Sequence, residues 1–276
     1  MDTVNENAMF ETDDDFHRIG FVQKAMKLIN AYQPERGACV IDIDASWGMG
    51  KTTLLKMWIN ELEKDYSSYP EFKNAFSKCV YYNAWENDYN SDSLTPLIYA
   101  ICGSLSAKAN KTDGWGKGFK GRMKAMDSAG AGIITSYLCY RSTRDEMLAR
   151  GIGGMAVATT DAAFHLLESN EPEELGKAYL EDVEKRNAFH KAVTDLAGAC
   201  GKLFIFIDEL DRCKPTFAIQ TLECIKHYFN IPNVVFIFAT DMSQLAHTVE
   251  TYYGIGMDAG GYFLKFFDHI MHLPRS

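Results

Sequence analysis

The sequence predicts a three-layer α/β fold, in which helices cover both faces of a mostly parallel five-stranded sheet. Two observations lead to this prediction. Several short runs of consecutive apolar residues are typical of strands that are buried on both faces. Each of the first four runs is followed by an amphipathic helical pattern, which is the alternation expected of a parallel sheet. With 276 residues, 47% of them hydrophobic, the chain is long enough for one large domain.

The predicted strands follow one another with helices between them. A helix from Thr52 follows the first strand, and a helix from Leu94 follows the second. The helix after the third strand opens at Pro215, where a missing N–H costs no helical hydrogen bond, and a shorter helix around Leu245 follows the fourth. The expected strands are residues 38–44, 79–83, 203–208, 234–240 and, more weakly, 269–273.

Three parts of the chain fall outside this pattern. Residues 1–15 are rich in acidic side chains and are predicted to form a disordered tail. Residues 16–274 are predicted to form one domain, with a helical insertion at about 104–175, between the second and third strands, because that region is rich in Gly, Ala and Met. The last predicted strand ends at Pro274, so a C-terminal helical lid is expected to be absent.

Charge and cysteine content exclude several classes of protein. The formal net charge is −9, whereas a protein that coats nucleic acid non-specifically is normally basic. The seven cysteines form no C-x-x-C pair, which favours reduced, buried thiols over a zinc site or a disulfide framework. The acidic start is unlike a secretory signal, and no apolar run reaches the roughly 18 residues of a spanning helix. These features predict a cytoplasmic protein.

A phosphate-loop pattern follows the first predicted strand. The segment A-S-W-G-M-G-K-T, from Ala45 to Thr52, matches G-x-x-x-x-G-K-[ST] at every fixed position except the first. Glycines allow the backbone N–H groups to point at an anion, and the start of the helix adds its positive dipole end. Lys51 would contact the outer phosphates and Thr52 would offer a hydroxyl to Mg²⁺. The predicted nucleotide-binding residues are Ser46, Trp47, Gly48, Met49, Gly50, Lys51, Thr52 and Thr53.

The third predicted strand ends in two acidic residues, Asp208 and Glu209. The carboxyl ends of parallel strands meet at one edge of the sheet, so both are expected beside the loop. Asp208 is predicted to hold Mg²⁺ together with Thr52, and Glu209 to take a proton from the attacking water as the catalytic base. The alternative is that Glu209 only pairs with Arg212 or caps the following loop.

The fourth predicted strand ends at Thr240 and Asp241. NTPases with an extra strand between the loop strand and the acidic strand have the sheet order 5-1-4-3-2, and residues 79–83 supply such a strand. The fourth strand would then lie next to the loop strand, so Asp241 or Thr240 is predicted to sense the γ-phosphate. The alternative is that Asp241 is the N-cap of the next helix, and the two roles are compatible.

Several segments together resemble the KAP family of P-loop NTPases, which are relatives of the AAA+ and STAND groups. The most specific segment is I-F-I-D-E-L-D-R-C, ending at Cys213, because a generic NTPase needs only its first two acids. Ala45 and Glu209 depart from the family pattern, which has Gly and commonly Asp at these places. The other matching segments begin at residues 45, 82, 233 and 262.

The resemblance implies a Mg²⁺-dependent ATPase whose turnover drives a conformational or assembly change. Family members serve in membrane-associated scaffolding or in excluding phage, and many carry transmembrane helices where this chain has its insertion. In AAA+ relatives the segment before the fifth strand carries an arginine finger that reaches the ATP of a neighbouring subunit. Lys265 stands at that place, so it is a candidate catalytic residue acting in trans, in a homo-oligomer or with a partner protein. The alternative is a surface lysine.

A basic segment between Lys108 and Lys124 carries six Lys or Arg residues, with Trp115 and Phe119 among them. Such a segment could contact nucleic acid or an anionic membrane surface, although a solvated loop is the more common explanation. The leading functional prediction is thus an ATPase that uses ATP and Mg²⁺. The rival is a nucleotide-binding switch or scaffold with little intrinsic hydrolysis, which needs a partner.

Overall fold

The computed structural model describes residues 5–33, 35, 37–64, 67–72, 77–111, 125, 128–129, 131, 172–199 and 201–274. Its centre is a five-stranded sheet in which all four neighbouring pairs are parallel. The order is β2-β3-β4-β1-β5, which reads 5-1-4-3-2 when counted from the β5 edge, the order expected from the sequence. The strands are β1 (Cys39–Asp44), β2 (Ser77–Asn83), β3 (Lys202–Asp208), β4 (Val234–Thr240) and β5 (His269–His272).

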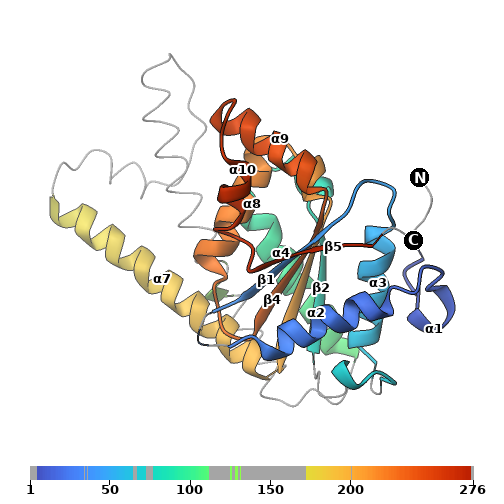
Figure 1. Cartoon of the computed structure of the whole chain (residues 1–276). Helices are drawn as coiled ribbons and strands as arrows, with labels where there is room; N and C mark the ends of the chain where they lie inside the picture. Colours follow the sequence, from blue (N-terminus) through green and yellow to red (C-terminus); the bar gives the residue numbers. More distant parts are fainter. Residues whose placement is uncertain are drawn as a thin grey trace.

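Helices cover both faces of this sheet (Figure 1). One hydrophobic core lies between the sheet and the three N-terminal helices, α1 (Phe10–Asp13), α2 (Ile19–Ala31) and α3 (Lys51–Leu62). The other lies between the sheet and α4 (Leu94–Lys111), α7 (Pro172–Ala199), α8 (Pro215–Tyr228), α9 (Met242–Tyr253) and α10 (Ala259–Phe263). The short 3₁₀ turns are η2 (Pro70–Phe72), η3 (Trp85–Asn87) and η4 (Leu210–Arg212).

The two inner strands β3 and β4 show why runs of consecutive apolar residues predict strands in this sequence. All seven residues of β4 are buried, as are six of the seven residues of β3. A strand with a core on each side needs apolar side chains at successive positions rather than at alternate ones. Phe204 and Phe206 face the core under α3, whereas Ile205 and Ile207 face the core under α8.

The N-terminal segment differs from the prediction of a disordered tail at residues 1–15. Residues 10–13 form α1, and Ala8 and Phe10 are buried against the core under α3. The amide of Asn60 donates to the carbonyl oxygens of Glu6 and Ala8, which fixes this segment further. The acidic composition suggested disorder, but two apolar side chains among the acids are enough to anchor the segment on α3.

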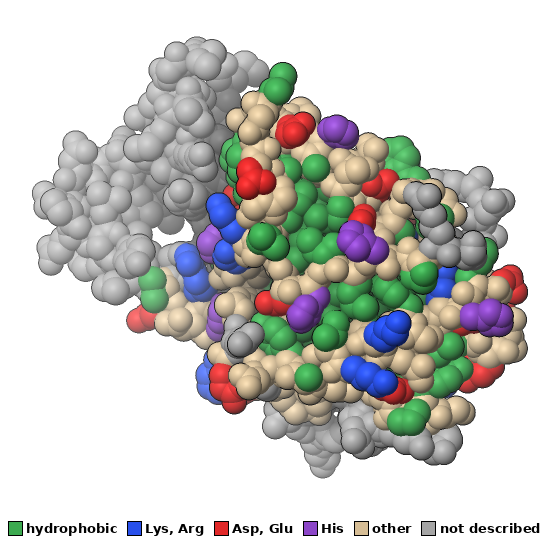
Figure 2. Space-filling model, viewed as in Figure 1, with side chains coloured by type: hydrophobic (Ala, Val, Ile, Leu, Met, Phe, Trp, Pro, Cys, Tyr) green, Lys and Arg blue, Asp and Glu red, His purple; other side chains and the backbone are tan. Residues whose placement is uncertain are grey.

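The predicted insertion at about 104–175 lies mostly outside the described residues. Of the basic segment between Lys108 and Lys124, the described part is the C-terminal end of α4, which runs to Lys111. On the face shown in Figure 2, Lys and Arg side chains lie among acidic and hydrophobic ones. Within the ranges that the structure describes, no helix combines the length and the hydrophobicity that crossing a bilayer requires.

Candidate functional site

The candidate site begins at the loop that joins β1 to α3. Gly48 and Gly50 have φ angles of +80° and +72°, a left-handed conformation that glycine adopts without strain. Gly50 is also the N-cap residue of α3 and offers no side-chain hydrogen bond to the first turn. The first N–H groups of this 12-residue helix therefore remain available to an anion. The loop has the geometry that the phosphate-loop pattern predicts.

Lys51 lies at the start of α3 and folds back over the loop. Its ammonium group donates a hydrogen bond to the carbonyl oxygen of Ala45, and only 9% of the residue is exposed. The backbone N–H of Ala45 in turn donates to the carbonyl oxygen of Thr240, at 3.0 Å. Ala45 thus ties the loop to the end of β4, and its methyl group fits where the pattern has glycine. The lysine is held beside the loop amides, where a bound phosphate would lie.

Asp208 ends β3 and meets the loop directly. Its carboxylate accepts a hydrogen bond from the phenol of Tyr81 at 2.9 Å, and the hydroxyl of Thr52 lies close enough to interact with it. The residue is 1% exposed, and this burial raises the pKa of the Asp208 carboxyl above its ordinary value, although the hydroxyls of Thr52 and Tyr81 and the N–H of Glu209 oppose the rise. The two residues predicted to share Mg²⁺, Thr52 and Asp208, are therefore in contact.

Glu209 follows with an unusual backbone. Its φ and ψ angles are +58° and +27°, the left-handed region, which costs a residue with a β-carbon about 1 kcal/mol or more. Its N–H donates to the carboxylate of Asp208 at 2.9 Å. The side chain turns toward β2 and η4, where one carboxylate oxygen accepts from the amide of Asn83 at 3.2 Å and the other pairs with Arg212 at 2.8 Å. The ion pair named as the alternative for Glu209 is thus present.

The end of β4 lies where the sheet order predicts, next to β1. Asp241 is the N-cap of α9, because its carboxylate accepts from the N–H groups of Ser243 and Gln244. Thr240 is fully buried and donates its hydroxyl to Asp42 at 2.8 Å. Both side chains are therefore engaged within the protein. A contact of either one with a γ-phosphate stays a prediction.

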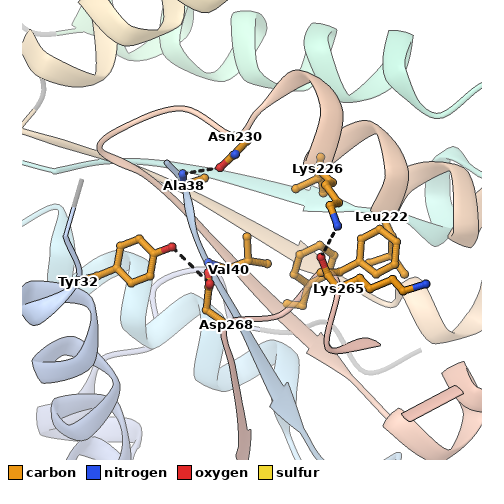
Figure 3. A pocket seen from close by; sticks show the side chains of 11 residues that line it. Tyr32, Ala38, Val40, Leu222, Lys226, Asn230, Lys265 and Asp268 are labelled. Carbon is orange, nitrogen blue, oxygen red and sulfur yellow. Dashed lines mark hydrogen bonds between the residues drawn. The ribbon is translucent and has the colours of Figure 1, made fainter. Parts of the chain in front are cut away.

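Lys265 lies far from this loop. It lines a cavity of about 190 Å³ with Val40, Lys226 and Asp268 (Figure 3). The N–H of Asp268 donates to the carbonyl oxygen of Val40, near the first residue of β1, whereas the loop follows the last. At about 3.3 Å per residue, these points are roughly 16 Å apart along the strand. The exposed Lys265 thus belongs to the opposite edge of the sheet, and any contact with a phosphate would have to be made in another molecule.

Sequence reasoning missed several residues of the site. Arg18 is 4% exposed and donates to the carbonyl oxygen of Gly50 at 3.3 Å. No feature of the sequence distinguishes it from a surface arginine. Tyr81 and Asn83 had a signal, because alternate residues near the end of a predicted strand share one face and reach the same sheet edge. The strand was identified, but its polar side chains were not assigned to the site.

Two exposed tryptophans lie beside Glu209. Trp47 of the loop donates its indole N–H to Asp211 at 2.7 Å. The guanidinium of Arg212 lies 5.7 Å from the Trp47 ring and 5.6 Å from the Trp85 ring. An open cleft of about 480 Å³ begins here and continues along α9, past Gln244. This side of the site joins the loop, η3, η4 and α9.

Asp42 is a fully buried carboxyl on the central strand β1, and it yields a stability prediction. Burial raises the pKa of Asp42 well above its ordinary value, more than the hydrogen bond from Thr240 lowers it. A raised pKa in the folded state means that stability is lost as pH rises from the unfolded-state pKa, about 3.9, through the folded one. The variant Asp42→Asn lacks this ionisation. We expect urea denaturation to show it gaining at least about 1 kcal/mol relative to the wild type between pH 5 and pH 8.

The control for that measurement is Asp195→Asn, at an exposed ion pair on α7. Its stability difference from the wild type is expected to stay nearly flat over the same interval. A difference for Asp42→Asn that is equally flat, or that falls as pH rises, would contradict the assignment of a raised pKa to Asp42.

Comparison with known proteins gives three findings. The family model of the KAP family P-loop domain matches residues 18–275. The uncharacterized protein MJ0182 of Methanocaldococcus jannaschii is 28% identical over 170 residues, which are 58% of this chain and 87% of that protein. The ORC2 protein of Aeropyrum pernix, solved as ADPNP-ADP complexes, superimposes with a TM-score of 0.38 at 12% identity. That match covers 93% of this chain, which spans about half of the solved one, 48%.

Proposed function

We propose that this chain, which belongs to the KAP family of P-loop domains, binds ATP with Mg²⁺ at the carboxyl edge of its sheet and hydrolyses it. One observation carries the proposal: the hydroxyl of Thr52, in the glycine loop, contacts the carboxylate of Asp208, more than 150 residues later in the chain. A loop that offers N–H groups and a lysine to phosphate is thereby joined to an acidic strand end. Phosphate binding requires the loop, and hydrolysis requires the acidic strand end.

The phosphate groups would be bound by the residues of the loop. The N–H groups from Ser46 to Gly50 and the start of α3 supply donors, and Lys51 supplies the positive charge. A bound triphosphate would accept the hydrogen bond that the ammonium group of Lys51 now donates to the carbonyl oxygen of Ala45. ATP rather than another nucleoside triphosphate is proposed on the family resemblance.

A magnesium ion fits the two residues in contact. Thr52 and Asp208 offer a hydroxyl and a carboxylate oxygen, and Mg²⁺ usually takes only one or two protein ligands beside phosphate oxygens and waters. Among the residues the structure describes, no cluster of three His, Cys, Asp or Glu side chains could hold a metal by itself, which accords with a site completed by the nucleotide. When bound, Mg²⁺ neutralises charge on the phosphates.

Glu209 is the proposed base. Its side chain is partly exposed, at 20%, so a water molecule can reach it, and its backbone places it directly after the proposed magnesium ligand. Glu209 would take a proton from the water that attacks the γ-phosphate, and Asp241, at the end of the neighbouring strand, would contact that phosphate. Hydrolysis would then drive a conformational or assembly change.

A partner molecule is proposed to complete the site. Lys265 is exposed at the opposite sheet edge. Its ammonium group could therefore contact a nucleotide that is bound to a second copy of the chain or to another protein. Turnover that rises with protein concentration in the wild type but not in Lys265→Ala would support this role. Service in phage exclusion or at a membrane surface, and nucleic-acid or membrane contact through the segment between Lys108 and Lys124, rest on the resemblance and the composition alone.

A second candidate function is a nucleotide-dependent switch with little hydrolysis of its own. The observation that favours it is that both carboxylate oxygens of Glu209 are already engaged, one by Asn83 and one by Arg212. Phosphate release by the purified chain, measured with ATP and Mg²⁺, separates the two functions. Release at a few turnovers per minute or faster supports an ATPase, and nucleotide binding without release supports a switch.

The magnesium assignment predicts a specific defect in Thr52→Ala. Removing the hydroxyl takes away one magnesium ligand and leaves the loop amides and Lys51 in place. We expect the Mg²⁺ concentration for half-maximal ATP turnover to rise roughly tenfold, which corresponds to about 1.4 kcal/mol. The matched control is Thr194→Ala, on α7, whose hydroxyl donates to the carbonyl oxygen of His190 in the same helix. Equal Mg²⁺ dependence in Thr52→Ala and the control would remove Thr52 from the metal site.

A further inference from the structure

Glu209 is arranged in a way that does not suit a base ready to act. Arg212 lies 2.8 Å from one carboxylate oxygen, and the amide of Asn83 lies 3.2 Å from the other. A general base must present a free oxygen to the water whose proton it takes. If Arg212 moved away, one oxygen of Glu209 would be open to that water.

The position of Arg212 depends on the phosphate loop. Its guanidinium lies between the rings of Trp47 and Trp85, at 5.7 and 5.6 Å, within the range of a cation–π attraction. Trp47 belongs to the loop and donates its indole N–H to Asp211, the buried residue that precedes Arg212. Two contacts thus connect a residue of the loop to the short turn η4 that carries the arginine.

We propose that Arg212 is a positioning residue that holds Glu209 inactive, and that Trp47 releases it when the loop binds a triphosphate. The proposal rests on the proposed function and adds its regulation. A triphosphate held by the loop would lie against the N–H groups around Trp47, and a shift of the indole on binding would loosen η4. The open cleft along α9 gives the guanidinium a place to go, next to Gln244. Nucleotide binding and activation of the base then become one event.

The test compares Arg212→Gln with Arg212→Lys. Turnover is measured at saturating ATP and Mg²⁺, and the Kd is measured separately with a labelled non-hydrolysable analogue. Glutamine removes the charge, so we expect turnover to rise about threefold, the size of an ion pair at this exposure, with the Kd changed less than twofold. Lysine keeps the charge but not the planar fork, so a smaller rise is expected. The double variant Arg212→Gln with Glu209→Gln is expected to have no turnover above the single Glu209 variant.

The matched control is Arg186→Gln. Arg186 also lies over an aromatic ring, that of Tyr228 at 5.4 Å, but on α7 and away from the loop. Its turnover is expected to equal that of the wild type. A second readout is tryptophan emission, because Trp47 and Trp85 flank Arg212. Adding the analogue with Mg²⁺ is expected to change the emission of the wild type and of Arg186→Gln, and to change it by less than half as much in Arg212→Gln.

Four outcomes count against the proposal. Turnover in Arg212→Gln that equals the wild-type value, or that falls, shows that the arginine does not hold Glu209 back. A fall in turnover together with a lower melting temperature shows a structural role. If the wild type and Arg212→Gln both bind ATP and neither releases phosphate, Arg212 is not what prevents turnover, although the nucleotide site stands. If the wild type binds no ATP, the proposed function itself fails, and the Kd alone reveals it.

Discussion

Lys51→Ala is expected to lose at least about 30-fold in affinity for ATP, because removing one member of a buried, hydrogen-bonded charge pair costs about 2–5 kcal/mol. The ammonium group is almost fully buried beside the loop amides, so no other described lysine is placed to substitute for it there. Isothermal titration with ATP and Mg²⁺ measures the effect. The wild type is expected to bind, and the variant to show no saturable heat at the same concentrations.

Two comparisons make this result specific. Lys226→Ala removes a lysine from the opposite edge of the sheet, where its ammonium group bonds the carbonyl oxygen of Lys265, and it is expected to bind ATP like the wild type. Thermal denaturation without nucleotide is expected to give Lys51→Ala a melting temperature close to that of the wild type. Affinity within twofold of the wild type in Lys51→Ala would mean that the loop binds no triphosphate.

Glu209→Gln is expected to bind ATP with unchanged affinity and to lose turnover by about 10² to 10⁴-fold, the usual contribution of a positioned general base. Glutamine has the shape of glutamate and keeps a carbonyl oxygen for the amide of Asn83, but it cannot take a proton from water. Binding is measured by titration and turnover by phosphate release. Glu223→Gln, on α8, where the carboxylate accepts a hydrogen bond from Tyr253, is the matched control and is expected to hydrolyse ATP at the wild-type rate.

The same pair of measurements separates the base from a structural residue. A variant that loses affinity and turnover together would assign Glu209 to the fold of the loop region rather than to proton transfer. A variant that hydrolyses ATP at the original rate would require another base, and Asp208 and Asp211 both contact residues of the loop.

The sheet and the phosphate loop were readable from the sequence because their residue types follow from geometry alone. A strand covered on both faces must be apolar throughout, and a loop that bends through left-handed conformations favours glycine. Once the strand order was set, the meeting of Thr52 with Asp208 followed, since both lie at the carboxyl edge of parallel strands. The two residues are distant in the chain, but the order of the strands is enough to predict that they lie close together.

The partners of Glu209 could not be chosen in advance. The sequence allowed an ion pair with Arg212 or a free carboxylate, and the choice depends on Asn83 and on two tryptophans from separate turns, η3 and the loop. Arg18 was missed because burial of a charged side chain is decided by packing, here of α2 on the loop, and not by local sequence. The order in the N-terminal segment was missed for a similar reason, since Phe10 finds its site on α3.

The left-handed backbone at Glu209 sets two demands on one position against each other. Glycine would adopt that conformation without strain, and it would remove the carboxylate with its two polar contacts, to Asn83 and Arg212. Stability alone therefore does not explain why a glutamate occupies this position. The bend after β3 thus costs about 1 kcal/mol of stability that glycine would save, and the proposed role of Glu209 as the base would account for this cost.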